Sequence, residues 1–430
     1  MNVQTKPADD IARDVAGLVA ELGRRAKLAA VALRTASTET KNKALSDAAR
    51  LIRERRAAIL AANAKDIEAA KAAGMSEVLQ DRLLLNEARV EAMAKGLDDI
   101  AALPDPVGAK LEEWTRPNGL VISRVRVPIG VIGVIYEARP NVTADAGALC
   151  LKSGNVVVLR GGSDSFHSSR AIVALLREAL AVAGLPVDCV QLVPVTDRAA
   201  VGELLRATDW LDLIVPRGGR SLIDRVTEES RVPVLRHYDG ICHVYVDRDA
   251  DVAMARDVVA NAKMRRVSIC GAAETLLVDR AALDTHLMPV LEQLHALGCE
   301  VRGDSEVVKR DAKAVAASDK DWRTEYLAPV IAVAAVDGVE GAIAHIARFG
   351  SQHTESIVTG NAATAERFLS EVDSAIVMHN ASTQFADGAE FGLGAEIGIS
   401  TNRMHARGPV GLVELTTYKN VVRGHGTLRP

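Results

Sequence analysis

The sequence of 430 residues has few aromatic side chains, with 5 Phe, 3 Trp and 5 Tyr. This scarcity argues against aromatic surfaces on which nucleic-acid bases would stack. The sequence also lacks an excess of positive charge, because 52 Lys and Arg face 56 Asp and Glu and the formal net charge is −4. No global basic field is available to hold nucleic acid or an anionic membrane, so we expect neither as a partner.

Cysteine is sparse and has no pattern. No C-x-x-C pair occurs among the five: Cys150, Cys189, Cys242, Cys270 and Cys299. This argues against a disulfide framework and a structural zinc site, and we expect no metal. No apolar run approaches the roughly 18 residues of a membrane span, and acidic residues precede the first apolar run. These absences indicate a soluble, cytoplasmic protein.

The pattern along the chain predicts helices first and then two α/β domains. From Asp9 to about Ala102 apolar residues recur at helical spacing, with helix starts expected near Thr38 and at Asn86. Residues 119–127 alternate apolar and polar side chains, which predicts a strand of an arm. From residue 130 to 247, and again from 274 to 378, short β-branched runs alternate with helical stretches. This alternation is typical of parallel sheets covered on both faces.

Six strands are expected in the first α/β domain. They are Val131–Ile135, Val156–Leu159, Val190–Val195, Leu211–Val215, Val232–Leu235 and His243–Val246. The last part of the chain, from Gly388, is glycine-rich and then strand-like over Gly411–Val422.

Two glycine-rich turns follow strands of this domain, at Leu159-Arg160-Gly161-Gly162-Ser163 and at Pro216-Arg217-Gly218-Gly219-Arg220-Ser221. Glycine lets a phosphate approach the backbone, the next helix offers free N–H groups, and arginine adds bidentate bonds. Neither turn is a G-x-G-x-x-G or Walker A sequence, and a plain strand-to-helix turn is the alternative for each. Two such turns at the ligand-binding edge of a doubly wound sheet favour a phosphate-bearing ligand.

Cys270 has the most polar and basic surroundings of the five cysteines, with Lys263, Arg265 and Arg266 before it. Nearby cations lower a thiol pKa and create a nucleophile, whereas a buried packing residue is the alternative. Asn141 stands just before a helix, where its amide either donates to an oxyanion or caps the helix.

Two polar loops contain candidates for binding an anionic substrate. His353 lies in residues 350–355 and Arg407 lies in residues 405–409. Ordinary surface turns are the alternative for both loops.

Eight segments, taken in order, resemble one known family. They are PIGVIGVIYEARPNVT (128–143), LRGGSDS (159–165), PRGG (216–219), CHVYVD (242–247), SICGAAETLLVD (268–279), AIAHIARFGSQHTESI (342–357), EFGLGAEIGIST (390–401) and HARGPVGLVELTTYK (405–419). The chain resembles the γ-glutamyl phosphate reductase (glutamate-5-semialdehyde dehydrogenase) family, a branch of the aldehyde dehydrogenase superfamily.

The resemblance implies an α/β, aldehyde dehydrogenase-like fold with a Rossmann-type cofactor domain, an α/β catalytic domain and a β-arm for oligomerisation. The expected boundaries are 1–115 and 132–246 for the NADPH-binding domain, with 383–395 returning to it, 247–382 for the catalytic domain, and 116–131 with 396–430 for the arm. A homo-oligomer is expected, and glutamate 5-kinase is a candidate partner.

The resemblance also implies roles for site residues. Cys270 matches the catalytic thiol and Asn141 the oxyanion-hole amide. The cofactor-binding set is Arg160, Gly161, Gly162 and Ser163 at the adenosine ribose, Pro216, Arg217, Gly218 and Gly219 at the pyrophosphate, and Glu325 at the nicotinamide ribose. Arg160 is expected to favour NADPH by pairing with its 2′-phosphate, and Arg407, His353 or Arg217 to bind the substrate.

The implied reaction is NADPH-dependent reduction of L-glutamyl 5-phosphate to L-glutamate 5-semialdehyde, in proline biosynthesis. Aldehyde dehydrogenases carry a glutamate general base in an E-L-G-G motif, where this chain has Arg236-His237-Tyr238-Asp239-Gly240. The missing base fits a reductase that must not hydrolyse its thioester. The alternatives are an aldehyde-oxidising dehydrogenase, a reductase of another acyl phosphate such as the aspartyl one, and a non-catalytic scaffold.

Overall fold

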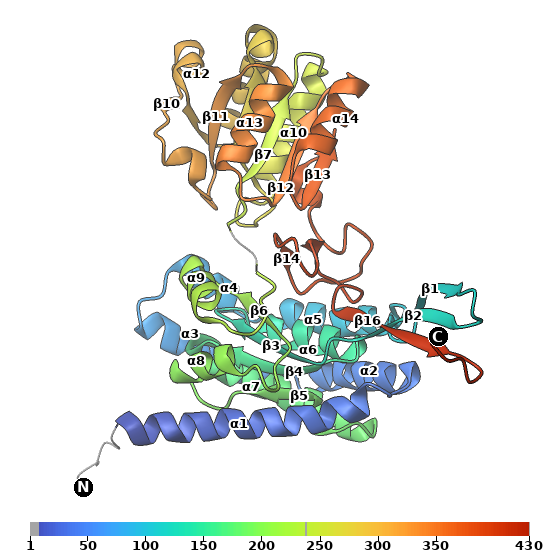
Figure 1. Cartoon of the computed structure of the whole chain (residues 1–430). Coiled ribbons are helices and arrows are strands. Elements are labelled where there is room, and N and C mark those ends of the chain that lie inside the picture. The colour runs from blue at the N-terminus through green and yellow to red at the C-terminus, as the bar shows by residue number, and fades with distance from the viewer. Residues whose placement is uncertain (1–7, 237–238, 430) are drawn as a thin grey trace. The chain divides into compact units, whose positions relative to one another are not determined.

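The computed structural model describes residues 8–236 and 239–429 (Figure 1). The chain forms two compact units. Unit 1 comprises Met1–Arg236, Leu393–Gly398 and Val410–Pro430, and unit 2 comprises His237–Gly392 and Ile399–Pro409. Each unit is built around its own parallel sheet, as the alternating pattern predicted.

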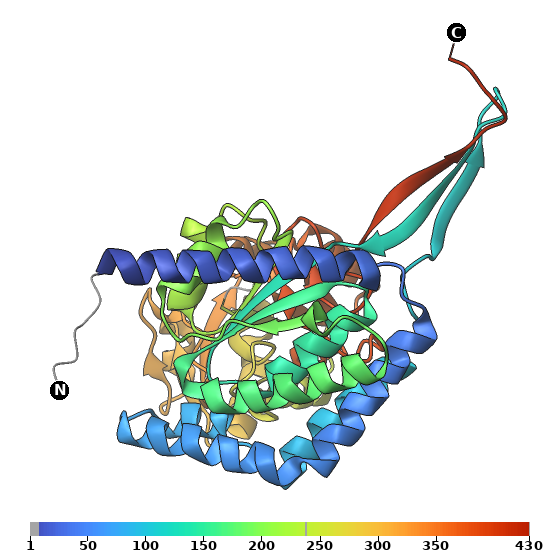
Figure 2. The same ribbon diagram turned by 90° about the horizontal axis from the view of Figure 1, so that it is seen from below.

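Unit 1 has a four-stranded parallel sheet in the order β5-β4-β3-β6. The strands are β3 (Val131–Tyr136), β4 (Val156–Gly161), β5 (Val190–Leu192) and β6 (Leu213–Arg217). Helix α1 packs along one face (Figure 2), and α6 and α7 cover the other. The central strands are therefore buried on both sides and consist almost entirely of branched apolar residues.

The helices of unit 1 are mostly amphipathic and make further layers around the sheet. They are α1 (Ala8–Leu33), α2 (Thr38–Glu54), α3 (Arg56–Ala72), α4 (Glu77–Leu83), α5 (Glu87–Ala102), α6 (Asn141–Lys152), α7 (Phe166–Val182), α8 (Ala199–Arg206) and α9 (Arg220–Glu229). The two expected helix starts are confirmed. Asn86 Oδ1 accepts the N–H of Arg89 at 2.9 Å, and Ser37 Oγ accepts the N–H of Thr40 at 3.2 Å.

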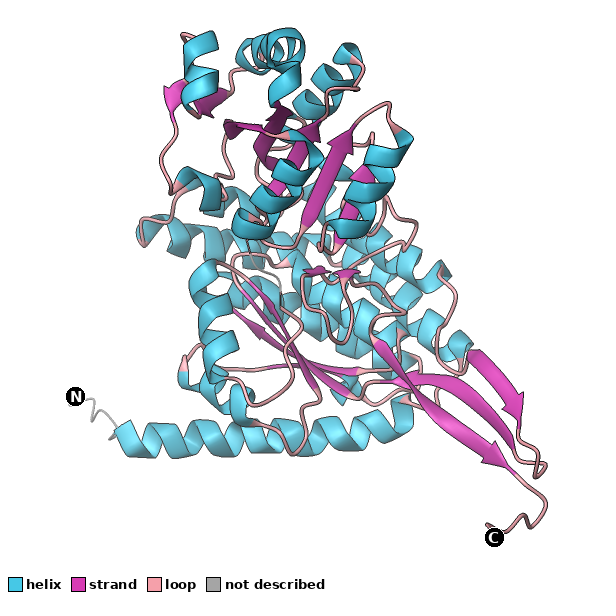
Figure 3. Cartoon of the chain, turned by 45° about the horizontal axis from the view of Figure 1, so that its top comes forward, coloured by secondary structure: helices cyan, strands magenta, loops and turns pink. Residues whose placement is uncertain are grey.

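An antiparallel arm belongs to unit 1 (Figure 3). It contains β1 (Lys110–Thr115), β2 (Val121–Pro128) and β16 (Thr416–Arg423) in the order β1-β2-β16. The expected arm residues 116–131 and 396–430 omit β1, whose sequence KLEEWT has no apolar alternation, and they include residues 399–409, which lie in unit 2.

Unit 2 has a seven-stranded parallel sheet in the order β10-β9-β11-β8-β7-β12-β13. The strands are β7 (Cys242–Val246), β8 (Ala273–Asp279), β9 (Glu300–Gly303), β10 (Val315–Ala316), β11 (Val330–Val336), β12 (Thr354–Val358) and β13 (Ile376–His379). The helices are α10 (Val252–Met264), α11 (Met288–Ala296), α12 (Ser305–Arg310), α13 (Gly338–Phe349) and α14 (Ala362–Glu371). A short antiparallel pair, β14 (Ile399–Ser400) with β15 (Gly408–Pro409), completes the unit.

Side chains that alternate along each strand enter two separate apolar clusters. Val244 and Val246 of β7 pack in one cluster with α10 and α11, whereas Tyr245 packs in the other with Phe368 of α14. Both faces of this sheet are thus covered, which explains why its strands read as continuous apolar runs.

Two expectations for the strands are corrected. Val232–Leu235 forms only an isolated bridge from Val234 to Ile214, and the N–H that a ladder requires is absent at Pro233. The expected boundary at 246 put His243–Val246 in the first domain, but β7 pairs with β8 and β12 in unit 2. A short run buried on both faces fits either sheet equally well. None of the described helices is both long and apolar enough to cross a membrane.

Candidate active site

The amino end of the sheet in unit 2 gathers several residues that are far apart in the sequence. Gly240 and Ile241 precede β7, Cys270 precedes β8, and Ser351 precedes β12. Because parallel strands all begin at the same edge, these turns meet there. Most α/β proteins bind ligands at the opposite, carboxyl edge of the sheet.

Cys270 differs from the other cysteines in its exposure. It is partly exposed, whereas the other four are buried. Burial raises the pKa of Cys189 and Cys299 to about 12, and it raises the pKa of Cys150 and Cys242 well above the ordinary range, so these thiols stay protonated. Cys270 is therefore the cysteine that a solute can reach.

Backbone contacts on its carbonyl group hold Cys270 in place. The Cys242 thiol donates to the Cys270 carbonyl oxygen at 3.0 Å. A Cβ on Gly240 would lie 2.1 Å from that same oxygen, so only glycine fits there. The position of the candidate nucleophile thus depends on close packing against the segment before β7.

Two of the three cations expected to activate Cys270 are engaged elsewhere. Lys263 Nζ lies 2.5 Å from Glu274 Oε2, and both side chains are fully buried. Arg265 reaches the side chain of Gln384, whose amide donates to the carbonyl of Ala262 at 2.9 Å. Lys263 and Arg265 therefore fix the loop before β8.

Glu274 is a buried carboxyl that sequence reasoning missed. Burial raises its pKa to about 7, and the neighbouring Lys263 opposes that shift. Its other oxygen accepts the N–H of Leu327 at 3.3 Å, which anchors the segment containing Glu325. Its only sequence signal is a charged residue inside an otherwise apolar strand.

Glu325 and Ser351 fasten the segment that covers Cys270. Glu325 Oε1 accepts the N–H of Gly240 at 3.0 Å, and Ser351 Oγ accepts the N–H of Ile241 at 2.9 Å. The role of Glu325 at a cofactor ribose stays a prediction. His237 and Tyr238, in the stretch that lacks the general base, lie outside the described residues.

His353 lies under this segment and is fully buried. Its Nδ1 is 3.5 Å from Cys242 Sγ and 2.8 Å from Thr354 Oγ1. Contact of His353 with the substrate stays a prediction, and it would require this buried ring to become accessible.

Arg407 also lies in unit 2, but its charge is already matched. It donates to Asp373 Oδ1 at 2.7 Å and to the Asp373 carbonyl at 3.0 Å, and Arg403 pairs with the same carboxylate. Binding of a substrate anion by Arg407 stays a prediction, and it would require this pair to rearrange.

In unit 1, Asn141 is the first residue of α6. Its Nδ2 donates to Asp145 Oδ2, one turn later, at 2.9 Å. Burial raises the pKa of Asp145 to about 6, although Asn141 and the charge of Arg217 lower it. Sequence reasoning gave Asp145 no role.

The turn after β4 brings Gly161, Gly162 and Ser163 to the carboxyl edge of the unit 1 sheet. Arg160 is only 7% exposed, and its terminal nitrogens donate to the carbonyls of Gly161 at 2.6 Å and Thr196 at 2.9 Å. These bonds order the turn, whereas Arg160 Nε is buried without a hydrogen-bond partner among the described residues. The pairing of Arg160 with a 2′-phosphate stays a prediction.

The turn after β6 carries Pro216, Arg217, Gly218 and Gly219 into α9. A Cβ on Gly218 would lie 2.6 Å from Glu137 Oε2, whereas one on Gly219 would meet no atom within 4 Å. Arg217 Nε is buried without a hydrogen-bond partner among the described residues. The open space at Gly219, the start of α9 and the unsatisfied Arg217 Nε suit a phosphate. The N–H of Gly219 donates to Glu137 Oε2 at 3.2 Å, so a phosphate would have to displace this carboxylate.

The architecture of the two units, with a reachable thiol in one and glycine-rich turns in the other, agrees with comparisons to known proteins. The sequence model of the Aldehyde dehydrogenase family matches residues 4–308. The chain belongs to the aldehyde dehydrogenase family. It is thereby an oxidoreductase, and the family uses nicotinamide cofactors.

Individual relatives agree with one another. The Gamma-glutamyl phosphate reductase of Paramagnetospirillum magneticum is 60% identical over 417 residues, 97% of this chain and 99% of that protein. The protein of that name from Brucella suis is also 60% identical, with the same coverage. The crystal structure of Gamma-glutamyl phosphate reductase from Thermotoga maritima is 47% identical, covers 96% of this chain and 100% of that one, and has a TM-score of 0.94.

Proposed function

We propose that this chain reduces L-glutamyl 5-phosphate to L-glutamate 5-semialdehyde with release of phosphate, through a thioester on Cys270. The observation that carries the proposal is the exposure of Cys270, the partly exposed thiol among five, at the packed amino end of the unit 2 sheet. The identity of 60% over nearly the full length to reductases of this name supports the choice of substrate.

The residues of unit 1 fit a dinucleotide cofactor, which we propose to be NADPH. Gly219 leaves open space beside the backbone before α9, only glycine fits at Gly218, and Arg217 offers an unsatisfied Nε. These residues would hold the pyrophosphate, with Gly161, Gly162 and Ser163 at the adenosine ribose. When bound, the cofactor supplies the hydride that reduces the acyl group.

The protein's own groups account for the rest of the mechanism. The Cys270 thiolate attacks the acyl carbon, and a side-chain amide such as that of Asn141 donates to the tetrahedral oxyanion. One such donor contributes on the order of 3 kcal/mol. Phosphate leaves without strong acid assistance. No glutamate occupies residues 236–240, so the glutamate base that would direct water at the thioester is missing there.

A reverse assay tests the proposal. The enzyme is supplied with pyrroline-5-carboxylate, the cyclised form of the semialdehyde, and NADP⁺, with and without inorganic phosphate. Because phosphate must cleave the thioester in this direction, we expect NADPH formation only when phosphate is present. Oxidation at the same rate without phosphate would identify an aldehyde-oxidising dehydrogenase instead.

We further propose that the arm mediates a homo-oligomer. Tyr418 and Val422 on β16 are 52% and 55% exposed, which is unusual for large apolar side chains on a strand. Light scattering of the chain with residues 411–430 removed tests this, since we expect a smaller assembly. Association with glutamate 5-kinase and a cytoplasmic location stay predictions.

A further inference from the structure

Asp145 occupies a place where a carboxylate is costly. It lies on α6, the helix that packs against the sheet of unit 1, and it is partly buried. On α5, Gly96 faces Asp145 and offers no side chain to pair with it; a Cβ built on Gly96 would lie 4.0 Å from Asp145 Oδ1. Arg217 on β6 is the charged group that acts on it. No ion pair within 4 Å offsets the burial among the described residues.

The hydrogen bond of Asp145 is directed at Asn141. The two residues are four positions apart on α6 and therefore lie on one face, with Nδ2 of Asn141 2.9 Å from Oδ2 of Asp145. An ionised carboxylate only accepts hydrogen bonds, so the amide must turn its NH₂ group, and not its oxygen, toward Asp145. One Nδ2–H is used in this bond and the second remains to donate elsewhere.

We propose that Asp145 is a positioning residue that holds the Asn141 amide with its second Nδ2–H presented to the oxyanion. This inference rests on the proposed function, because it gives Asn141 its role in that reaction. A free amide rotates by 180° and places its carbonyl oxygen where the donor should be. An oxygen there would repel the developing negative charge.

The protonation state of Asp145 should then affect kcat. Its pKa is raised to about 6 by burial, with Asn141 and Arg217 opposing the shift. As the pH falls through that value the carboxyl gains a proton, can donate to the amide oxygen and favours the flipped amide. We therefore expect kcat to fall as the pH drops below about 6, because Asp145 becomes protonated.

The decisive experiment is a double-mutant cycle measured with the phosphate-dependent reverse assay. We expect Asn141→Ala to lower kcat by roughly 10²–10³-fold, and Asp145→Ala by about tenfold or more with little change in the KM for phosphate or pyrroline-5-carboxylate. The double variant should be no slower than Asn141→Ala, because Asp145 acts only through the amide.

Asp145→Asn separates orientation from charge. Like the protonated carboxyl, its neutral amide can also donate to the Asn141 oxygen, so we expect it to keep the lowered kcat that the wild type shows below about pH 6. Since the introduced amide does not titrate, the fall of kcat near pH 6 should disappear. Melting temperatures of all variants are measured alongside, to show that each is folded.

Three outcomes would overturn the inference. A raised KM with unchanged kcat would mean that Asp145 binds the substrate ammonium group. Additive losses in the double variant would mean that Asp145 acts independently of Asn141. If the wild type is inactive in the assay, the proposed function fails. The orientation of the amide by Asp145 is then still tested by NMR, through the side-chain ¹⁵N–¹H signals of Asn141. These signals must titrate near pH 6 in the wild type and not in Asp145→Asn, or the orientation by Asp145 is wrong.

Discussion

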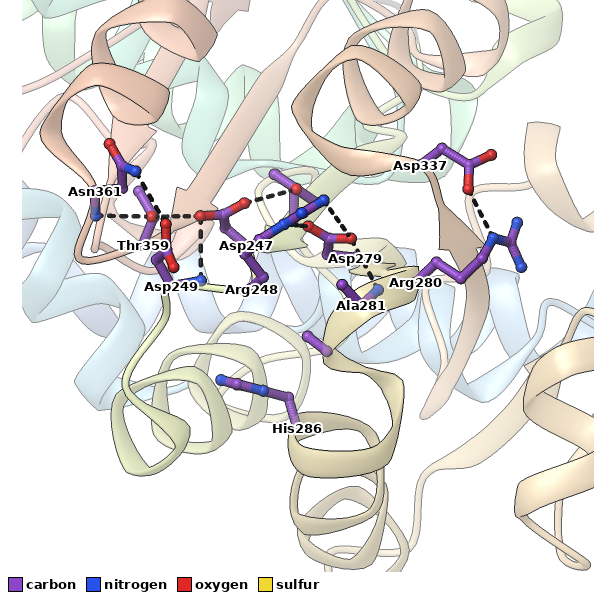
Figure 4. A network of polar contacts seen from close by, with 12 residues as sticks. Asp247, Arg248, Asp249, Asp279, Arg280, Ala281, His286, Asp337, Thr359 and Asn361 are labelled. Carbon is purple, nitrogen blue, oxygen red and sulfur yellow. Dashed lines mark hydrogen bonds and ion pairs between the residues drawn. The ribbon is translucent and has the colours of Figure 1, made fainter.

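The two ends of the seven-stranded sheet in unit 2 are built in opposite ways. At the carboxyl end, acidic and basic side chains satisfy one another in a dense network (Figure 4). At the amino end, Cys270 is partly exposed and is held mainly by contacts to its backbone. The candidate nucleophile thus lies at the end opposite this network.

Most donor and acceptor atoms of the network at the carboxyl end already have hydrogen-bond or ion-pair partners. Arg248 binds the buried carboxylate of Asp279 at 2.6 and 3.2 Å, and the N–H of Ala281 donates to it at 3.0 Å. Asp247 accepts from Tyr245 Oη at 2.9 Å and from Thr359 Oγ1 at 2.7 Å. Such groups stabilise loops and leave little bonding capacity for a ligand.

The comparison shows that the exposure of a thiol and the packing around its backbone identify this candidate site better than a high number of polar side chains does. In open α/β sheets, ligands usually bind at the carboxyl ends of strands. Unit 1 follows this rule with its glycine-rich turns after β4 and β6, whereas the thiol of unit 2 lies at the other edge. Substitutions at the two ends of the unit 2 sheet should therefore affect different measurements.

The largest effect is expected at the amino end from Cys270→Ala. Removal of the nucleophile should lower kcat at least about 10³-fold in the reverse assay, because the thioester cannot form. Cys299→Ala, at a buried thiol in the core of the same unit, is the matched control and should keep nearly full kcat. Full activity of the Cys270→Ala variant would contradict the thioester mechanism.

Gly240→Ala should follow, with a loss of about 10²-fold in kcat. Its added Cβ would meet the Cys270 carbonyl oxygen at 2.1 Å, so the thiol must shift. Gly17→Ala adds the same methyl group where no atom lies within 4 Å, and should leave both kcat and melting temperature close to wild type. Unchanged kcat in Gly240→Ala would show that the thiol position does not depend on this contact.

At the carboxyl end we expect a loss of stability without a loss of activity. Asp279→Asn removes a buried charge that binds Arg248, and should lower the free energy of unfolding by about 1–3 kcal/mol, measured by urea titration. Its kcat should stay within about twofold of wild type, since the residue is far along β8 from Cys270. Asp337→Asn, in an exposed pair with Arg280, should change little. A large fall in kcat in Asp279→Asn would contradict the expectation that substitutions at the carboxyl end change stability and not activity.

The smallest effect is expected in the pH dependence of stability, from His345 on α13. The ring of His345 packs 5.5 Å from that of His243, and burial lowers the pKa of His345 to about 3. Between pH 6.5 and 3 the unfolded chain binds a proton there that the folded chain does not, so stability falls as the pH falls. The slope is at most about 1.4 kcal/mol per pH unit.

His345→Phe should make that slope shallower when melting temperatures are compared at pH 7 and pH 5. His167→Phe, at an exposed histidine of unit 1, is the control and should keep the wild-type slope. Equal slopes in wild type and His345→Phe would contradict burial of a neutral ring.

Much of the fold could be predicted from the sequence, because apolar strands and amphipathic helices each leave a local pattern. Strands β3 and β4 begin at the residues that their patterns indicate. The pattern could not assign β7 to its sheet, since a strand buried on both faces fits either sheet. It also missed β1, whose short sequence carries charges.

The candidate site was only half predictable. The context of Cys270 singled it out, although the cations that suggested its reactivity include Lys263, which proves to be paired. Gly240 and Ser351 could not be found, because their contacts join residues far apart in the chain and depend on the order of strands in the sheet. His353 and Arg160 were chosen for their chemistry, and the burial of both side chains could not be read from the sequence.

The contact between Gly240 and Cys270 has a practical consequence for dividing this chain. The chain passes between the two units at four points, and the first of them, after Arg236, lies only four residues before the glycine that contacts the backbone of the reactive cysteine. A fragment cut at the first residue of β7 would retain all seven strands and yet lose the covering peptide of the thiol. Gly240, just after this crossing, thus also supports the nucleophile, and an insertion or deletion beside it would alter reactivity before it altered the fold.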